Sequence, residues 1–224
     1  MADYPVQQLI DDIALAITPE DFHEAFLESC DVFDQANARL IAERGTQLAC
    51  RAGCSLCCSL RVDVFAHEVF LIADFIRSHF STEMLSGLKA RLATHAAIVL
   101  PLTPFEHATR NVVCPLLRDD GRCSIYEARP LSCRRHHSMD FAACQFTYDH
   151  PADLEFPGAH DVELFRKLTA ALRQTGEVYA EYGFDITIYE LGTALAEALD
   201  DAASWTRWHE GSQAFGNASV TPAG

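Results

Sequence analysis

The sequence predicts a mainly α-helical protein, in which a helical scaffold carries a central, loop-rich module that bears most of the cysteines. Apolar residues recur every three or four positions in segments before and after the centre, which is typical of amphipathic helices. Eight of the nine cysteines lie between Cys50 and Cys144, where glycine, proline and charged residues interrupt this periodicity. Beyond the helices, we expect at most a small β-hairpin.

The first predicted helix begins at Thr18, whose hydroxyl suits the N-cap position, and Pro19 suits the first turn. Apolar residues from Phe22 onward follow a helical spacing, and we expect the helix to end near Leu48. Cys30 falls on the same apolar stripe. Because free cysteine is often buried as a small apolar side chain, we interpret Cys30 as a core residue rather than a ligand.

Further elements are predicted on both sides of the second group of cysteines. The segment 60–64 alternates and predicts a short extended piece, and helical patterns cover 65–80, 82–98 (capped by Ser81), 161–182 and 187–203. Two prolines, at 101 and 104, are expected to end the second of these helices and open a loop. An Asp-Asp-Gly turn between short apolar runs predicts a hairpin over 114–126, and residues 140–157 read as irregular.

The charge balance excludes several classes of protein. The formal net charge is −15 and only two residues are lysine, so phosphate backbones would repel the chain. No apolar run approaches the roughly 18–20 residues of a membrane helix. The N-terminal stretch MADYPVQQLIDD has neither the basic nor the apolar part of a secretory signal. We therefore expect a cytoplasmic protein with no nucleic-acid partner and no membrane partner.

The spacing of the cysteines points to metal binding. In a reducing cytosol, clustered thiols hold metals or do redox chemistry more often than they form disulfides. The run Cys50-x3-Cys54-x2-Cys57-Cys58 brings soft thiolates together, and these select zinc, Cu(I) or iron–sulfur clusters. The spacing leaves these metals open. The proline after Cys114 resembles cluster loops, and neighbouring side chains diverge, which makes a vicinal pair awkward for a single zinc.

The full pattern, which includes Cys123-Ser-Ile-Tyr-Glu-Ala-Arg-Pro-Leu-Ser-Cys133-Arg, resembles the bacterial cysteine-cluster family often labelled YkgJ-like, the CxxCxxCC zinc- or iron-chelating domain. The resemblance covers about residues 50–145 and leaves the flanking helices out. It implies a metal-chelating or iron–sulfur protein. A flagellin lysine methylase carries a similar cysteine motif, which offers protein modification as one enzymatic direction. Glu68 lies where such sequences tend to carry an acid.

The candidate site residues follow from the pattern and the resemblance. The predicted metal ligands are Cys50, Cys54, Cys57, Cys58, Cys114, Cys123, Cys133 and Cys144. Arg129 and Arg134 are predicted to lie at the cofactor, with Arg135 nearby, because guanidinium groups offset the negative charge of a thiolate-ligated cluster. His136 and His137 are further ligand candidates, since imidazole binds both zinc and iron. No catalytic residue is indicated.

A length of 224 residues is enough for one sizeable core. We predict an N-terminal helical segment over 1–49, a cysteine-cluster metal-binding module with inserted helices over 50–145, C-terminal helices on the same core over 146–210, and a flexible tail over 211–224.

Two functions remain open at this stage. The first is an iron–sulfur protein, with a [4Fe–4S] cluster, in a redox or protein-modifying role toward an unidentified protein or small molecule. The alternative is a zinc-stapled binding module without catalysis. The Cys-x3-Cys-x2-Cys spacing also occurs in radical S-adenosylmethionine enzymes, but no alternation of strands and helices follows it here.

Overall fold

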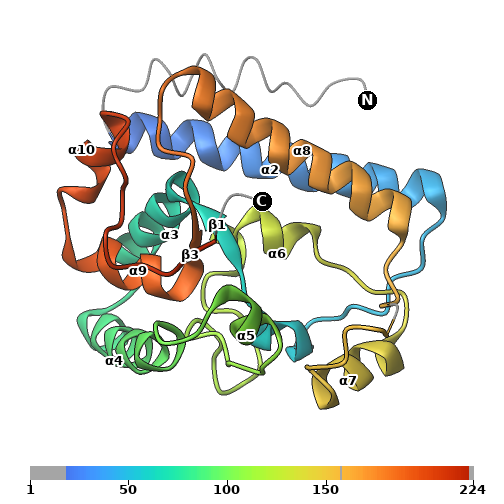
Figure 1. Cartoon of the computed structure of the whole chain (residues 1–224). Coiled ribbons are helices and arrows are strands. Elements are labelled where there is room, and N and C mark those ends of the chain that lie inside the picture. Colours follow the sequence, from blue (N-terminus) through green and yellow to red (C-terminus); the bar gives the residue numbers. More distant parts are fainter. Residues whose placement is uncertain (1–18, 157, 222–224) are drawn as a thin grey trace.

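The computed structural model describes residues 19–156 and 158–221, and the described chain is mainly helical, as predicted (Figure 1). Two long helices, α2 (Pro19–Arg44) and α8 (Val162–Glu181), lie side by side along one edge of the molecule. Helices α3 (Ala66–His79), α4 (Thr82–Val99) and α9 (Leu191–Asp200) form the centre and the opposite side.

The shorter elements complete the chain. They are η1 (Leu56–Ser59), α5 (Pro104–Ala108), η2 (Tyr126–Ala128), α6 (Leu131–Arg135), α7 (Phe141–Asp149) and α10 (Ser204–His209).

Helix α2 ends earlier than the sequence indicates. It stops at Arg44 instead of near Leu48, because Gly45 adopts the left-handed backbone (φ +64°) that closes many helices. The predicted N-cap, Thr18, lies outside the described residues. Cys30 is buried, with 1% of its surface exposed, and packs in the core as predicted.

One carboxylate ties the end of α2 to the start of α8. Asp161 accepts hydrogen bonds from Arg44 (2.8 Å) and from the hydroxyl of Thr46 (2.7 Å). It also caps α8 by accepting from the backbone N–H of Leu164 at 3.0 Å. Bonds from three residues to one side chain thus hold the end of α2 against the start of α8.

The main core lies where α9 packs on both α3 and α4. Apolar residues at helical spacing face inward from each helix. The fully buried ones include Val69, Ile72, Ile76, Leu88, Leu92, Ala194 and Leu195. Helix α4 begins as predicted, since the hydroxyl of Ser81 accepts from the backbone N–H of Met84 at 3.2 Å.

A three-stranded antiparallel sheet replaces the single small hairpin that we expected. Strand β1 (Asp63–Phe65) pairs with β2 (Ile188–Glu190), which pairs in turn with β3 (Val220–Thr221). Val64 lies opposite Tyr189, and Tyr189 lies opposite Val220. The strands come from distant parts of the chain, so local patterns could not reveal their pairing. The predicted 114–126 hairpin is reduced to one antiparallel bridge, Leu117 to Cys123.

Two segments that we predicted as loops are helical. Pro104 begins α5, because Thr103 and Glu106 form a capping box: the Glu106 N–H donates to the Thr103 hydroxyl, and the Thr103 N–H donates to the Glu106 carboxylate. The segment predicted as irregular from Asp140 contains α7. Asp140 caps this helix by accepting from the N–H of Ala142 at 2.8 Å.

The C-terminal predictions need two corrections. The helix predicted over 187–203 begins with strand β2 and contains only α9, and a separate helix, α10, follows it. The tail predicted to be flexible contains a packed segment. Ala214 and Phe215 are fully buried, and the ring of Phe215 meets that of Tyr189 edge-on at 5.0 Å. Residues 222–224 lie outside the described part of the chain.

A buried histidine makes the core sensitive to acid. His67 is 1% exposed and stacks on Tyr179 at 4.0 Å, and burial lowers its pKa to about 3. The unfolded chain therefore binds a proton near pH 6.5 that the folded chain does not, so the free energy of unfolding falls as the pH falls below that value. Between pH 7 and pH 5 this residue should cost about 2 kcal/mol.

We expect His67→Phe to remove that part of the pH dependence, and urea unfolding at both pH values measures it. His79→Gln, at an exposed position, is the matched control and should keep the wild-type difference. Equal pH dependence in wild type and His67→Phe would show that His67 does not titrate in this way.

Candidate metal centre

Backbone hydrogen bonds bring the two groups of cysteines together. The N–H of Cys114 donates to the carbonyl of Cys58 at 2.8 Å, and the N–H of Val112 donates to the carbonyl of Ser59 at 3.2 Å. The chain before the second group therefore runs along η1, which carries Cys57 and Cys58. Residues more than fifty positions apart in the sequence are held in direct contact.

The loop that carries Cys50 and Cys54 is bound on its outer side to the segment before α7. The N–H of Ala49 donates to the carbonyl of Ser138 at 2.9 Å, and the Cys50 thiol lies 3.9 Å from the same carbonyl. Gly53 turns the loop with a φ of +82°, which L side chains rarely adopt. Helix α7, which carries Cys144, packs on η1 and so closes this side.

The remaining two cysteines lie on a tight turn and a short helix. Cys123 forms the bridge with Leu117, and Gly121 turns the chain between them with a φ of +76°. An added Cβ at Gly121 would stand 3.2 Å from the Gly53 carbonyl, so the two cysteine loops touch at their glycines. Cys133 lies in α6, where its N–H donates to the Pro130 carbonyl at 2.9 Å.

Electrostatic coupling among the thiols separates them into two groups. Burial raises the pKa of Cys133 strongly, and the thiols of Cys114, Cys123 and Cys57 raise it further. Burial also raises the pKa of Cys114 to about 12, with Cys123 adding to the shift. We call Cys114, Cys123 and Cys133 the inner group.

The second group includes Cys50, which is exposed. Burial raises the pKa of Cys50, and the thiols of Cys57, Cys144 and Cys54 raise it further. We call Cys50, Cys54 and Cys144 the outer group. Cys57 couples to both groups and its thiol contacts that of Cys58, which raises the pKa of Cys57 strongly. The vicinal pair therefore lies between the two groups.

The donor set fits a soft metal. All nine cysteines are free thiols. Partly buried thiols such as Cys114 and Cys133 resist ionisation, and a coordinated cation supplies the positive charge that deprotonates them. No three cysteine sulfurs of the described chain lie within 4.8 Å of one another. Around a single tetrahedral zinc the sulfurs would be about 3.8 Å apart, so the described thiols are not already gathered at the spacing of one zinc site.

Glu68 positions the loop that leads to Cys133. Its carboxylate is 1% exposed and accepts from the N–H of Phe65 at 2.9 Å and from the N–H of Leu131 at 2.8 Å. The first bond caps α3 and the second holds the start of α6. Burial raises the pKa of Glu68 to about 7, although both N–H groups and Arg134 oppose the shift.

The two arginines predicted at the cofactor differ in their surroundings. Arg129 stacks on Tyr126 at 4.0 Å, and its charge helps lower the pKa of Cys123 against the dominant effect of burial. Arg134 is buried and bonded to protein groups: it forms an ion pair with Asp34 of α2 and donates to the carbonyls of Arg129 and Glu127. Their role toward a cofactor stays a prediction.

Arg135 offers a further positive charge. Its guanidinium lies over Phe165 at 4.4 Å and donates to the hydroxyl of Thr169 at 2.7 Å. The Nε atom is buried and has no hydrogen-bond partner in the described chain. Burial lowers the pKa of Arg135, and the Cys133 thiolate opposes that shift. The charge of Arg135 therefore couples to Cys133.

The two histidines after Cys133 have different surroundings. His137 is buried and uses both ring nitrogens: Nδ1 donates to the Arg135 carbonyl at 3.1 Å, and Nε2 accepts from the Asp161 N–H at 3.1 Å. These bonds join the cysteine region to the start of α8 and leave no nitrogen for a metal. His136 is exposed.

The sequence analysis did not predict Asp34 as a partner of Arg134, because no local pattern links the two residues.

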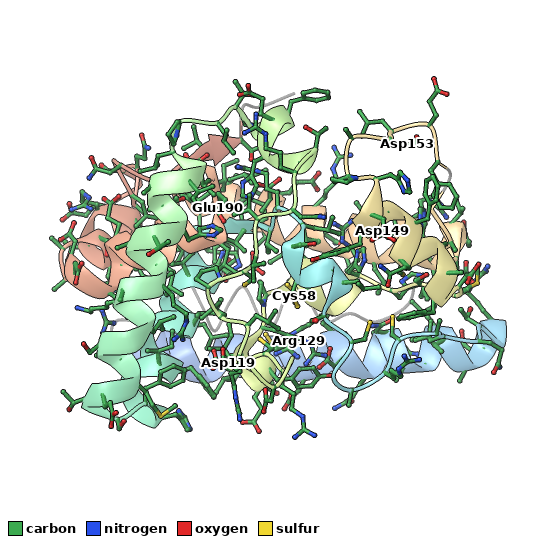
Figure 2. All side chains as sticks on the ribbon, turned by 90° about the horizontal axis from the view of Figure 1, so that it is seen from below. Cys58, Asp119, Arg129, Asp149, Asp153 and Glu190 are labelled. Carbon is green, nitrogen blue, oxygen red and sulfur yellow. The ribbon has the colours of Figure 1, made fainter. Side chains whose placement is uncertain are left out.

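Figure 2 shows Cys58 near the middle of the view, between the labels of Arg129 and Glu190, with yellow sulfur atoms close to it. Comparison of the sequence with known protein families finds a match over the cysteine region. Residues 49–155 match the CxxCxxCC family. Its description is "Putative zinc- or iron-chelating domain", and the match includes all eight clustered cysteines. The match confirms the resemblance read from the sequence.

The match to this family supports metal binding by the clustered cysteines of the matched region. No curated protein and no solved structure matches the chain. No helix in the described residues is both long and apolar enough to cross a membrane.

Proposed function

We propose that the chain is an iron–sulfur protein that carries a [4Fe–4S] cluster and acts in redox or protein-modifying chemistry in the cytoplasm. The observation that supports it most is the grouping of the thiols. Three thiols lie in each group and two more lie between them, so the eight divide into two sets of four. In this proposal one thiol of the vicinal pair completes the inner set, and the other completes the outer set.

The inner set is the proposed cluster site. A cubane takes four thiolates and needs wider sulfur spacing than one metal ion. Partial burial of Cys114 and Cys133 limits the access of water, and Arg129 and Arg135 offset negative charge. A bound cluster would supply one-electron chemistry. The outer set, in which Cys50 is exposed, would hold a second metal in contact with solvent.

A zinc-stapled binding module is the second candidate. It is favoured by the small amount of regular structure at the cysteines, since η1, α6 and one bridge carry most of them. Such segments often depend on a structural zinc for their order. Exposure of Cys50 and Cys57 argues against a fully closed zinc site.

The variant Cys58→Ala separates the two candidates. If the thiols form two sets of four, removal of one vicinal thiol leaves one set with three ligands, and part of the metal is lost. If one zinc staples the domain, the second vicinal thiol is redundant and the zinc content is unchanged. The measurement is iron and zinc per chain in wild type and Cys58→Ala, both purified without oxygen.

We expect iron in the wild type and, in Cys58→Ala, a partial loss of the total bound metal, counted as iron and zinc together. Cys30→Ala is the matched control, because Cys30 is buried in the core away from both groups, and it should keep the full metal content. One zinc per chain, unchanged in Cys58→Ala, would overturn the iron–sulfur proposal.

A further inference from the structure

Three buried side chains outside the cysteine region come together between α4, α5 and the sheet. They are His95 of α4, His107 of α5 and Glu190 at the end of β2, exposed by 5%, 1% and 3%. One ligand atom from each lies within 4.8 Å of the others. Figure 2 shows Glu190 beside α4 and apart from Cys58 and Arg129.

The spacing of the donor atoms suits one metal ion. His95 Nε2 and the Glu190 carboxylate are 3.0 Å apart. Two ligands bound at about 2.0–2.1 Å to a tetrahedral zinc are separated by about 3.3 Å, which is close to this distance. Two imidazoles and one carboxylate also form a common donor set for catalytic zinc and for non-haem ferrous iron.

The hydrogen bonds of the two imidazoles are incomplete. His95 Nδ1 and His107 Nε2 are buried and have no hydrogen-bond partner in the described part of the chain. Burying polar nitrogens without partners costs free energy, about 1–3 kcal/mol for each. Both rings are nevertheless held close to the same carboxylate, which is how imidazoles are arranged at a metal.

The surroundings fix these groups in place. The Glu190 carboxylate caps α9 by accepting from the N–H groups of Gly192 (3.0 Å) and Thr193 (2.8 Å). An added Cβ at Gly192 would stand 2.4 Å from the His95 ring, so only glycine leaves room for the imidazole. These contacts are set by three separate elements and would need little rearrangement to hold an ion.

The charges also favour a cation. Glu190 supplies a carboxylate, and this carboxylate accepts hydrogen bonds from His95 and from two N–H groups of α9. The guanidinium of Arg61 lies 3.4 Å from His107 Nδ1 and would repel a cation, but Asp63 pairs with it at 2.8 Å.

We propose that His95, His107 and Glu190 form a second metal site, separate from the cysteines, for a single divalent cation of the zinc and ferrous iron class. The site has nitrogen and oxygen ligands only. It clamps α4, α5 and the start of α9, and it does not depend on which metal the cysteines hold.

Cobalt(II) is a suitable probe, because its X-ray absorption edge reports its own ligands whatever metal the cysteines carry. The whole protein, purified with its cysteine-bound metal, is incubated with excess cobalt(II) long enough for local opening of the five-residue helix α5, and is then desalted. We expect one cobalt per chain, with nitrogen and oxygen neighbours and no sulfur. His107→Gln should weaken cobalt binding by about 100-fold or more.

His150→Gln, at an exposed histidine, is the matched control and should keep the cobalt. Sulfur neighbours around cobalt in the wild type, no retained cobalt, or equal retention in wild type and His107→Gln would each overturn the proposal. The wild-type spectrum decides the ligands even if His107→Gln fails to fold. Iron and zinc at the cysteines are counted in the same samples, so failure of the cysteine proposal is seen separately.

Discussion

Cys123→Ser and Cys54→Ser are each expected to lose a different part of the bound metal, and the double variant is expected to lose all of it. Cys123 belongs to the inner group and Cys54 to the outer group. A serine hydroxyl is a poor ligand for soft metals, so a set with three thiolates should release its metal. The losses should therefore add up to the wild-type content.

Metal analysis of anaerobically purified protein measures this prediction. Iron should fall to background in Cys123→Ser, since the inner set is the proposed cluster site, and should be retained in Cys54→Ser. Cys30→Ala should match the wild type. If Cys123→Ser keeps its iron, or Cys30→Ala loses it, our division of the cysteines is wrong.

Removing the metal should make the cysteine loops less ordered and easier to cleave, while the long helices should stay folded. The loops contain little regular structure, so coordination contributes much of their order. The exposed residues Arg51, Arg118 and Arg122 are trypsin sites within these loops. After anaerobic chelation we expect cleavage there to accelerate by at least about tenfold.

Trypsin sites on helices provide the comparison. Arg39 on α2 and Arg166 on α8 are also exposed, but their helices pack through apolar faces that need no metal. Mass spectrometry of the first fragments identifies the order of cleavage. If the helix sites are cut first, or chelation leaves the loop sites as resistant as before, the metal does not order the loops.

Local signals predicted much of the helical scaffold. Helices α3, α4 and α8 fall close to their predicted positions, because apolar residues recur along each and Ser81 and Asp161 provide caps. The sheet was not predicted, because its strands are joined only by pairing between residues far apart in the sequence. The packed C-terminal segment was missed for the same reason: Phe215 is buried by Tyr189 and other distant residues.

The cysteine pattern predicted the metal-binding region because the motif is local. What surrounds it was not predictable in the same way. The bond from the Leu131 N–H to Glu68, and the ion pair of Arg134 with Asp34, join segments that have no sequence relation. His137 was a ligand candidate on spacing alone, but contacts with Arg135 and Asp161 occupy both its nitrogens.

The most direct test of the iron–sulfur proposal is the content of iron and acid-labile sulfide per chain in wild-type protein purified without oxygen. We predict at least about four iron atoms per chain with an equal amount of sulfide, because a cubane contains both in equal number. Zinc at one or two atoms per chain, with no sulfide, would contradict the proposal and support the zinc-stapled module.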